Sequence, residues 1–575
     1  MARLIRRLGL MGLALFWLCP QVWLTPLARA DSGRVVILAE EIAAAKVAKI
    51  HEILSRVAGV SASSSSVSIH GSYKVKVFLD GASLTDPTSG YNAVTWDHLS
   101  PDNVAKIEVI LGAGGLIYGQ DASAGVILIT SKELESFQGG VKAYGGDFGF
   151  FRAEADLTVA KGLWGVSFLA GREEMGGFEP NEDKLIYRGS VKIVRRLDEG
   201  SVSLSSAMID DERGLYGYPG FPTPNARKRN RLFSLGQELK WREVTNNFTY
   251  QRGRVANRDP SLGLDQYLLV TEANDDLSMG LNPNSWLDLT LGTGFKKSWA
   301  ESSDFTPQSE YFWHVFSLAR MKTPIKGLGF SLGARYNYNS NFKNNFNPEV
   351  NLAFDRGDWR LGLKYSRAAN TPSFQQRYNR SSSTLPNPNL DLEFADNYTL
   401  SIAYRLTDRM SWRLNGFYNR ISGRITYDRP ANAGVGQYRN LGQATYEGGD
   451  LGFDWSLTEK VDLKANVTYA RAIDHDLGKT LTGRSRLSGT SELGFRPFPD
   501  FSAFLTVEYR TAAWGDRMNT TKIPGYALYG ARAEWKIGPA SVFFNIENIL
   551  NRRWLYSDGL NGPPRNFYLG LGYRF

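Results

Sequence analysis

The last nine residues of the chain limit its fold more tightly than any other segment. From Phe567 to Phe575 every odd position is apolar or aromatic, and every even position is polar, small or amphipathic. Because successive side chains of a β-strand point to opposite sides, this segment has one apolar face and one polar face. The same alternation recurs in residues 461–469 and 501–509. The pattern predicts strands that face lipid on one side and an aqueous lumen on the other.

A soluble β-sandwich is the alternative fold, since its half-buried strands alternate in the same way. A sandwich does not need long strands repeated along the whole chain with Tyr or Phe at their ends. The 27 Tyr, 31 Phe and 14 Trp are typical of the aromatic girdles of membrane barrels. We therefore expect a transmembrane β-barrel.

Residues 1–30 have the pattern of a secretory signal peptide. Three arginines lie within the first seven residues, an apolar stretch covers 8–18, and Ala28-Arg29-Ala30 fits the small-x-small cleavage pattern. The apolar stretch is shorter than the roughly 18 residues that a membrane-spanning helix needs. We expect a mature chain that starts at Asp31.

Removal of this segment changes the composition of the chain. The only cysteine, Cys19, lies within it, and the bulky Leu18 before Cys19 disfavours a lipoprotein anchor. The mature chain would then have no thiol, disulfide or cysteine metal site. Residues 1–30 carry four arginines and no acid, so their removal lowers the formal charge from +9 to +5. So small a charge, without a basic tail, does not indicate nucleic acid binding.

Short turns give the size of the barrel. Ten turn signals of the periplasmic kind divide residues 137–575 into eleven hairpins, which predicts about 22 antiparallel strands. A barrel of this width holds a plugged lumen. The turns lie at 161–162, 198–200, 242–243, 282–284, 324–327, 356–358, 407–408, 458–460, 497–500 and 538–539. The longer outward loops would be 211–230, 368–392 and 421–439.

Residues before the barrel have a different pattern and predict a small N-terminal α+β plug domain that fills the lumen. They contain a strand at Arg34–Leu38, a helical stretch at 40–57 and short strands at Val75–Leu79 and 126–130. The expected division is a signal peptide in 1–30, a plug domain in 31–136 and a transmembrane β-barrel in 137–575.

Several short motifs, taken in this order and spacing, resemble those of TonB-dependent receptors. Each motif is weak alone, but the set covers nearly the whole mature chain. In the plug they lie at 53–60, 78–81, 107–110, 116–119 and 124–127. In the barrel they lie at 371–374, 387–390 with Glu393, 440–444 and 545–548.

The resemblance implies a receptor in the outer membrane of a Gram-negative bacterium that imports a scarce nutrient with high affinity. TonB and its inner-membrane energising complex would supply the force. Length and compact loops look most like the cobalamin-receptor branch, but ferric-siderophore receptors share every motif. Other expected partners are the barrel-assembly machinery, which reads a terminal Phe such as Phe575, and lipopolysaccharide. We expect a monomer with no enzyme activity and no cofactor; the rival class is a non-energised outer-membrane pore or a surface adhesin.

The candidate ligand-binding residues fall in two segments. The resemblance implies binding above the plug, against apices that include Thr85, Asp86, Ser89, Tyr91 and Asn92. Loop 211–230 combines aromatic rings with a basic run, which suits an aromatic or anionic ligand. Its candidates are Tyr216, Tyr218, Phe221, Arg227 and Arg229. The alternative for this loop is contact with lipopolysaccharide phosphates.

Metal and haem sites are not indicated. No pair among the five histidines has helical metal-ligand spacing. Haem receptors of the resembled family carry a loop histidine near the Asn-Pro-Asn-Leu motif, and residues 370–390 contain none. The acid pairs Asp210-Asp211 and Asp275-Asp276 are either calcium ligands or solvated loop ends.

Two departures from the family pattern concern the plug. The resemblance implies arginines where the chain has His70 and Leu111, each paired with a barrel carboxylate, so we expect a less tightly held plug. A flexible coupling segment, the TonB box, would normally precede the first plug strand and pair with TonB as an added strand.

Only Asp31, Ser32 and Gly33 precede the first plug strand here. Three residues extend at most about 10 Å, too little to form a strand and reach the periplasm. Either a conventional box is absent or weak, or the first strand is itself the coupling strand. That strand consists of Arg34, Val35, Val36, Ile37 and Leu38.

Overall fold

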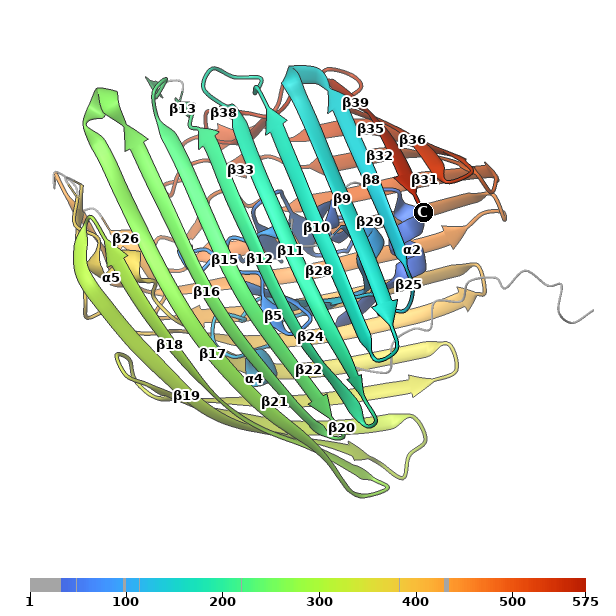
Figure 1. Ribbon diagram of the computed structural model, residues 1–575. Helices are drawn as coiled ribbons and strands as arrows, with labels where there is room; N and C mark the ends of the chain where they lie inside the picture. Colours follow the sequence, from blue (N-terminus) through green and yellow to red (C-terminus); the bar gives the residue numbers. More distant parts are fainter. Residues whose placement is uncertain are drawn as a thin grey trace, which may run out of the picture.

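A computed structural model places 22 long antiparallel strands in a closed barrel around a plug (Figure 1). The structure describes residues 33–47, 49–96, 100–112, 114–218, 220–381, 383–428 and 434–575. The expected signal peptide, Cys19, the mature start at Asp31 and His98 lie outside the described residues. None of the helices in these ranges has the length and apolarity needed to cross a bilayer.

The strand count and antiparallel closure agree with the sequence prediction. β39 closes the barrel against β8, with Leu571 opposite Ala143. The long strands are β8 (Gln138–Gly146), β9 (Phe150–Lys161), β10 (Trp164–Met175), β11 (Lys184–Leu197), β12 (Gly200–Gly214), β15 (Arg227–Trp241), β16 (Val244–Asp259), β17 (Leu264–Asn284), β18 (Leu287–Ser302), β19 (Phe305–Lys322), β20 (Leu328–Asn339), β21 (Asn345–Arg356), β22 (Trp359–Asn370), β24 (Glu393–Thr407), β25 (Met410–Ser422), β28 (Gln443–Ser456), β29 (Val461–Asp474), β31 (Leu487–Phe498), β32 (Phe501–Arg510), β35 (Tyr526–Ile537), β36 (Ala540–Glu547) and β39 (Asn566–Arg574).

Alternation along the strands explains the barrel. In β19, Tyr311, Trp313 and Val315 are exposed on the outer face, whereas Phe312 and His314 between them are buried. The predicted turns coincide with connections between these strands, except that 282–284 belongs to the end of β17 and the turn follows at residues 285–286.

The plug is built on a five-stranded sheet in the order β1-β6-β7-β4-β5. β4 runs parallel to β7 and the other pairs are antiparallel. Its elements are β1 (Arg34–Leu38), α2 (Ala39–Ala45), α3 (Ile50–Leu54), β2 (Val60–Ala62), β3 (Val67–Ile69), β4 (Val75–Leu79), β5 (Ala82–Ser83), β6 (Val104–Leu111), α4 (Gly115–Tyr118) and β7 (Gly125–Ser131).

The plug strands at Arg34–Leu38 and Val75–Leu79 form as predicted, and the predicted helical stretch forms only in part. The expected stretch 40–57 is two short helices, α2 and α3. Lys46 adopts a left-handed conformation with φ of 51° at the end of α2, and this conformation cannot continue a right-handed helix.

The remaining short helices and strands lie mainly in the connections between the barrel strands. The sheet β23-β27-β26 and helix α5 belong to the two longest outer loops, 371–392 and 423–442. The short elements are η2 (Pro101–Asn103), η3 (Asp147–Gly149), β13 (Gly217–Tyr218), β14 (Phe221–Pro222), η4 (Pro260–Leu262), α5 (Phe374–Tyr378), β23 (Thr384–Leu385), β26 (Ile425–Asp428), β27 (Gly436–Asn440), β30 (Lys479–Thr480), β33 (Ala513–Trp514), β34 (Lys522–Ile523), β37 (Leu555–Ser557) and β38 (Leu560–Asn561).

Candidate functional site

A cavity of about 380 Å³, here called the vestibule, lies between the plug and the outer loops. The plug contributes the loop 86–96, and strands β10, β11, β12, β15 and β16 contribute the wall. Helix α5 and Tyr438 of β27 line the remaining side. The vestibule is therefore the place where a ligand from outside would meet the plug.

Helix α5 is fixed firmly over the vestibule. Arg377 is fully buried, pairs with Glu310 of β19, and lies 5.0 Å from the ring centre of Phe374. A capping box starts the helix, because Ser373 Oγ accepts a bond from the backbone N–H of Gln376. Gln375 is left exposed on the vestibule side.

Most cations in the vestibule already contact a carboxylate, with Lys49 and Lys184 sharing the single carboxylate of Glu173. Lys49 and Lys184 both contact Glu173, at 2.9 Å and 2.6 Å, and Arg213 pairs with Asp211. Within the described residues, Lys228 has no carboxylate within 4.0 Å. The remaining lining consists largely of hydroxyl, amide and aromatic groups, among them Thr88, Ser89, Tyr91, Gln375 and Tyr438. Such a surface can hydrogen-bond and stack on a large polar ligand of low net charge.

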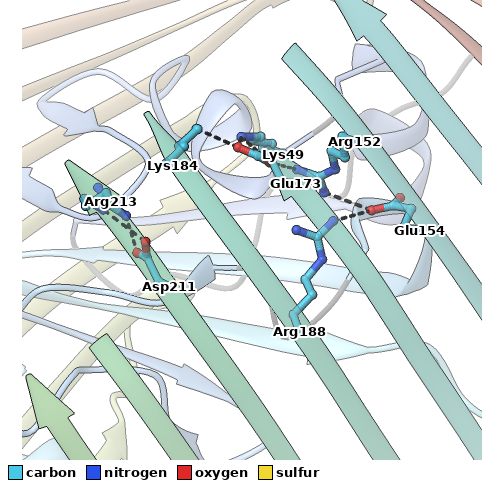
Figure 2. A network of polar contacts seen from close by, with 8 residues as sticks. All are labelled: Lys49, Arg152, Glu154, Glu173, Lys184, Arg188, Asp211 and Arg213. Carbon is cyan, nitrogen blue, oxygen red and sulfur yellow. Dashed lines mark hydrogen bonds and ion pairs between the residues drawn. The ribbon is translucent and has the colours of Figure 1, made fainter. Parts of the chain in front are cut away.

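A buried ionic network joins the plug to the barrel wall beside the vestibule (Figure 2). Glu173 of β10 is fully buried and accepts bonds from Lys49 of the plug, Lys184 of β11 and Arg152 of β9. Glu154 extends the network by contacting Arg152 at 2.9 Å and Arg188 at 3.1 Å. The network holds the plug segment ahead of α3 against three strands of the wall.

The five predicted plug residues lie in one loop, but they have different roles in the structure. Asp86 is buried and accepts bonds from the Thr88 hydroxyl at 2.7 Å and the Asn230 amide at 2.7 Å. Asn92 is buried and braces the plug by donating to Asp121 O. Ser89 and Tyr91 line the vestibule, and the Tyr91 side chain is 65% exposed. Thr85 lines a second cavity deeper in the lumen.

The predicted residues of 211–230 are divided between a rim hairpin and the barrel wall. Tyr216, Tyr218 and Phe221 belong to the β13–β14 hairpin region, and Phe221 is 60% exposed. Arg227 and Arg229 do not lie in a loop as expected, because β15 already begins at Arg227.

The side chains of Arg227 and Arg229 are engaged outside the vestibule. Arg227 pairs with Asp183 at 2.7 Å, and Arg229 pairs with Asp210 at 2.6 Å. Alternate residues of a strand face opposite sides, so the vestibule receives Lys228 and Asn230 of β15 instead. The odd-numbered residues Phe233 and Leu235 of the same strand face outward. Even-numbered residues such as Lys228 and Asn230 must then face the lumen, and this alternation was the sequence signal for them.

The acid pairs proposed as calcium ligands lie within strands. Asp210 and Asp211 belong to β12 and Asp275 and Asp276 to β17, so they are not loop ends. Within the described residues, no group of three His, Cys, Asp or Glu side chains is arranged to hold a metal ion.

The second cavity, here called the wall cavity, has a volume of about 290 Å³ and lies between the plug and β16–β20. It extends from the plug loop at Asp86 to Asn247 near the short turns. Burial lowers the pKa of Lys76, which lines this cavity, to about 8. Burial alone would raise the pKa of Asp121, but Lys74 and Lys76 outweigh it and hold this pKa below its usual range.

Two family models together cover most of the chain. The model described as TonB-dependent Receptor Plug Domain matches residues 26–126, and the model described as TonB dependent receptor-like, beta-barrel matches residues 183–549. The chain belongs to the TonB-dependent receptor family. It is accordingly an outer-membrane receptor of the kind found in Gram-negative bacteria, and the family consists of transporters and receptors rather than enzymes.

Relatives that match most of this TonB-dependent receptor carry different names. The vitamin B12 transporter BtuB of Photobacterium profundum is 23% identical over 583 residues, covering 94% of this chain and 92% of the relative. The iron-regulated outer membrane virulence protein of Vibrio cholerae is 23% identical over 571 residues, covering 88% and 85%. The ferric enterobactin receptor PfeA of Pseudomonas aeruginosa superposes with a TM-score of 0.80 at 17% identity, covering 94% of this chain and 99% of that structure. This last likeness concerns the fold.

The receptor's plug contacts the barrel wall through several charged pairs, although His70 and Leu111 stand where the resemblance implied arginines. A barrel carboxylate, Asp450, faces His70, and further ion pairs join plug and wall. The ion pairs are Lys46–Glu534 (2.7 Å), Lys49–Glu173 (2.9 Å), Arg56–Glu492 (2.9 Å), Asp80–Lys192 (2.7 Å), Asp102–Lys142 (2.5 Å), Asp102–Arg574 (2.5 Å) and Glu41–Lys464 (3.4 Å). His70 and Asp450 share a hydrogen bond of 2.6 Å on the same side of the barrel.

These ion pairs occupy one side of the barrel. Their wall residues all lie on β28–β39 and β8–β11, here called the ion-paired arc. Toward β12–β25, the hydrogen-bonded arc, the described plug residues make no ion pair with the wall. They are held there by hydrogen bonds, such as Gln251 to Ser83 O at 2.7 Å and Thr371 to Asp121 at 2.6 Å. The wall cavity lies on this second arc.

The candidate coupling strand, β1, is an edge strand of the plug sheet. It pairs with β6 over its full length, from Arg34 opposite Ile110 to Leu38 opposite Lys106. Arg34 also pairs with Glu108 at 2.6 Å. β1 is therefore part of the plug sheet. A partner strand could hydrogen-bond to the edge of β1 that now faces β6 only after displacing β6.

Proposed function

We propose that this receptor imports cobalamin or a closely related corrinoid. The observation that carries the proposal is the pairing of the vestibule cations Lys49, Lys184 and Arg213 with carboxylates. Cobalamin is a large ligand that carries many amide groups and little net charge. A vestibule of hydroxyl, amide and aromatic groups complements it, and a relative that covers 94% of the chain is named as a vitamin B12 transporter.

A ferric siderophore is the second candidate. Lys228 lines the vestibule without a carboxylate within 4.0 Å among the described residues, which leaves one cation for an anionic ligand. The similarity to an iron-regulated outer membrane protein also favours this class. A highly charged ferric catecholate would need more unpaired cations than the vestibule offers, because each buried charge requires a partner.

Ligand capture would involve both predicted segments. Ser89 and Tyr91 form part of the vestibule lining, whereas the exposed Phe221 stands in the rim hairpin and would make the first contact. Arg227 and Arg229 could contact the ligand only if they released Asp183 and Asp210, the carboxylates with which they now pair. We therefore place affinity in the vestibule and assign the rim to capture.

Ligand binding to purified receptor tests the cargo. We expect cobalamin to bind, and each of Tyr91→Ala and Gln375→Ala to weaken binding roughly tenfold, equivalent to about 1.4 kcal/mol. Tyr529→Ala is the matched control, since this exposed tyrosine lies on the outer face of β35, away from the vestibule. Binding of a ferric siderophore in preference to cobalamin would overturn the proposal.

We further propose that TonB coupling does not rely on a conventional box ahead of the plug. β1 is the first described strand, and it is held by β6 and by the Arg34–Glu108 ion pair. Binding of the TonB C-terminal domain to liganded receptor should therefore be weak, and the same for wild type and Val36→Pro. Tight binding that Val36→Pro abolishes and Val36→Thr preserves would identify β1 as the coupling strand instead.

A further inference from the structure

Four neighbouring strands place a row of nitrogen-bearing side chains along the vestibule wall. Lys184 of β11 is opposite Arg213 of β12, and Lys228 of β15 is opposite both Arg213 and Asn257 of β16. All four residues line the vestibule, close to the outer ends of their strands. Side chains of directly opposite residues project to the same face of a sheet. Lys184, Arg213, Lys228 and Asn257 are here called the donor row.

The carboxylates that neutralise the donor row stand one step deeper along the strands. Arg213 pairs with Asp211, two residues before it on β12. Lys184 pairs with Glu173 of β10 at 2.6 Å. Figure 2 shows these two pairs on neighbouring strands of the wall. The first two cations of the row therefore each have a carboxylate beneath them.

This pattern changes at β15, where Lys228 stands. The residue opposite Asp211 on β15 is Asn230, a neutral amide, and its Nδ2 donates to Asp86 of the plug at 2.7 Å. Among the residues that the structure describes, no carboxylate lies within 4.0 Å of Lys228. Like charges directly opposite each other destabilise a sheet, and Lys228 is directly opposite Arg213. An anionic group bound at Lys228 would relieve this repulsion.

The vestibule lining also has one positive charge in excess. Its described cations are Lys49, Lys184, Arg213 and Lys228, and its described carboxylates are Asp86, Glu173 and Asp211, with histidine counted as neutral. A ligand group with a single negative charge would balance this lining. The vestibule therefore fits a ligand that has one anionic group among many neutral polar groups.

We propose that the donor row binds the phosphodiester of a complete cobalamin, so that Lys228 selects cobalamin over cobinamide. This inference rests on the proposed function. Cobalamin has one phosphodiester, which links its nucleotide to the corrin ring, and cobinamide lacks both the nucleotide and the phosphodiester. The phosphodiester bears one negative charge at neutral pH. Its free oxygens accept hydrogen bonds from the Lys228 ammonium and the Asn257 amide, and a bond from a charged donor is the stronger kind.

Equilibrium binding of cyanocobalamin and dicyanocobinamide to purified receptor tests the inference. We expect wild type to bind cyanocobalamin at least tenfold more tightly. Lys228→Gln should weaken cyanocobalamin binding about tenfold, the loss expected for one hydrogen bond from a charged donor, and leave dicyanocobinamide binding unchanged. Lys228→Arg keeps the charge and should keep the selectivity. Added salt should weaken cyanocobalamin binding more in wild type than in Lys228→Gln, because salt screens the charge.

Lys240→Gln is the matched control. Lys240 lies on the same strand as Lys228 and on the same face, but at the opposite end of β15, where it pairs with Glu238 at 2.8 Å. We expect it to bind both ligands as wild type does. Heat-modifiable migration on gels verifies that every variant is folded.

The two ligands separate failure of this inference from failure of the proposed function. Equal affinity of wild type for cyanocobalamin and dicyanocobinamide would overturn the inference and leave corrinoid binding in place. An equal loss of both ligands in Lys228→Gln would have the same meaning, since the lysine would then not act through the phosphodiester. Binding of neither corrinoid to wild type would overturn both proposals.

Discussion

The Nε2 atom of His70 in the plug lies 2.6 Å from Oδ2 of Asp450 in the barrel wall, and both side chains are buried. The His70 ring also stacks on Phe417 with centroids 3.6 Å apart. A histidine here takes the place of the arginine that the family resemblance implied. The wall carboxylate is kept, so the plug is still fastened at this point.

Removal of this carboxylate should loosen the plug. Asp450→Ala leaves a buried imidazole without its partner, which costs about 1–3 kcal/mol. Single-channel recordings in increasing urea should then detect plug release at lower urea than for wild type. Asp454→Ala is the control, because Asp454 lies on the same strand and pairs with Arg413 rather than with the plug. Unchanged release in Asp450→Ala would mean that the pair does not hold the plug.

The plug is held by ion pairs on one side of the barrel and by hydrogen bonds on the other, and this difference predicts which side of the plug moves during transport. Ion pairs hold it to β28–β39 and β8–β11, and hydrogen bonds hold it to β12–β25, where the wall cavity also lies. We expect the plug to part from the hydrogen-bonded arc while the ion-paired arc stays closed.

Two disulfides, one on each arc, test this directly, since the sequence after residue 30 contains no cysteine. A Cβ added at Gly236 would lie 3.1 Å from the Cβ of Ala82, and one at Gly452 would lie 3.9 Å from the Cβ of Ala58. Both are close to the separations that disulfides use. Ala82→Cys with Gly236→Cys should block uptake until reductant is added, whereas Ala58→Cys with Gly452→Cys should leave it active. The opposite result would place the moving side on the ion-paired arc.

Lys76 should make plug docking depend on alkaline pH. Burial lowers its pKa from 10.5 to about 8, so the released plug binds more protons than the docked plug between these values. Docking stability therefore rises as pH increases from 8 to 10.5. Urea release measured at pH 7.5 and pH 10 should show this rise in wild type and a smaller one in Lys76→Met, with Lys106→Met as the half-exposed control. An equal rise in both would exclude Lys76 as its cause.

The sequence was sufficient for the barrel because the alternation of apolar side chains is local. Each strand is bounded by turn residues, and along each strand every second side chain faces outward, as Trp313 and Phe233 do. The helical stretch predicted at 40–57 is interrupted at Lys46, which adopts a left-handed conformation and contacts Glu534 of the barrel at 2.7 Å, a contact that the local sequence does not encode.

The vestibule was harder to predict because its residues come from distant segments. Gln375 and Tyr438 reach it only after the outer loops fold over the plug, and composition does not reveal that. The basic run at 227–229 predicts a loop site for Arg227 and Arg229, but both arginines lie in β15 and pair with carboxylates outside the vestibule. The pair of His70 and Asp450 joins residues 380 positions apart, a contact that no local pattern encodes.

The central claim, that the receptor takes up corrinoid through the vestibule, is tested most directly by transport in cells that lack their own corrinoid receptor. Uptake of radiolabelled cobalamin is measured in cells that express wild type or the Tyr91→Ala, Gln375→Ala double variant at equal levels. We predict saturable uptake by wild type at nanomolar cobalamin and at least a tenfold loss of uptake in the double variant at that concentration. Absence of cobalamin uptake by correctly folded wild-type receptor, or equal uptake by the double variant, would contradict the claim.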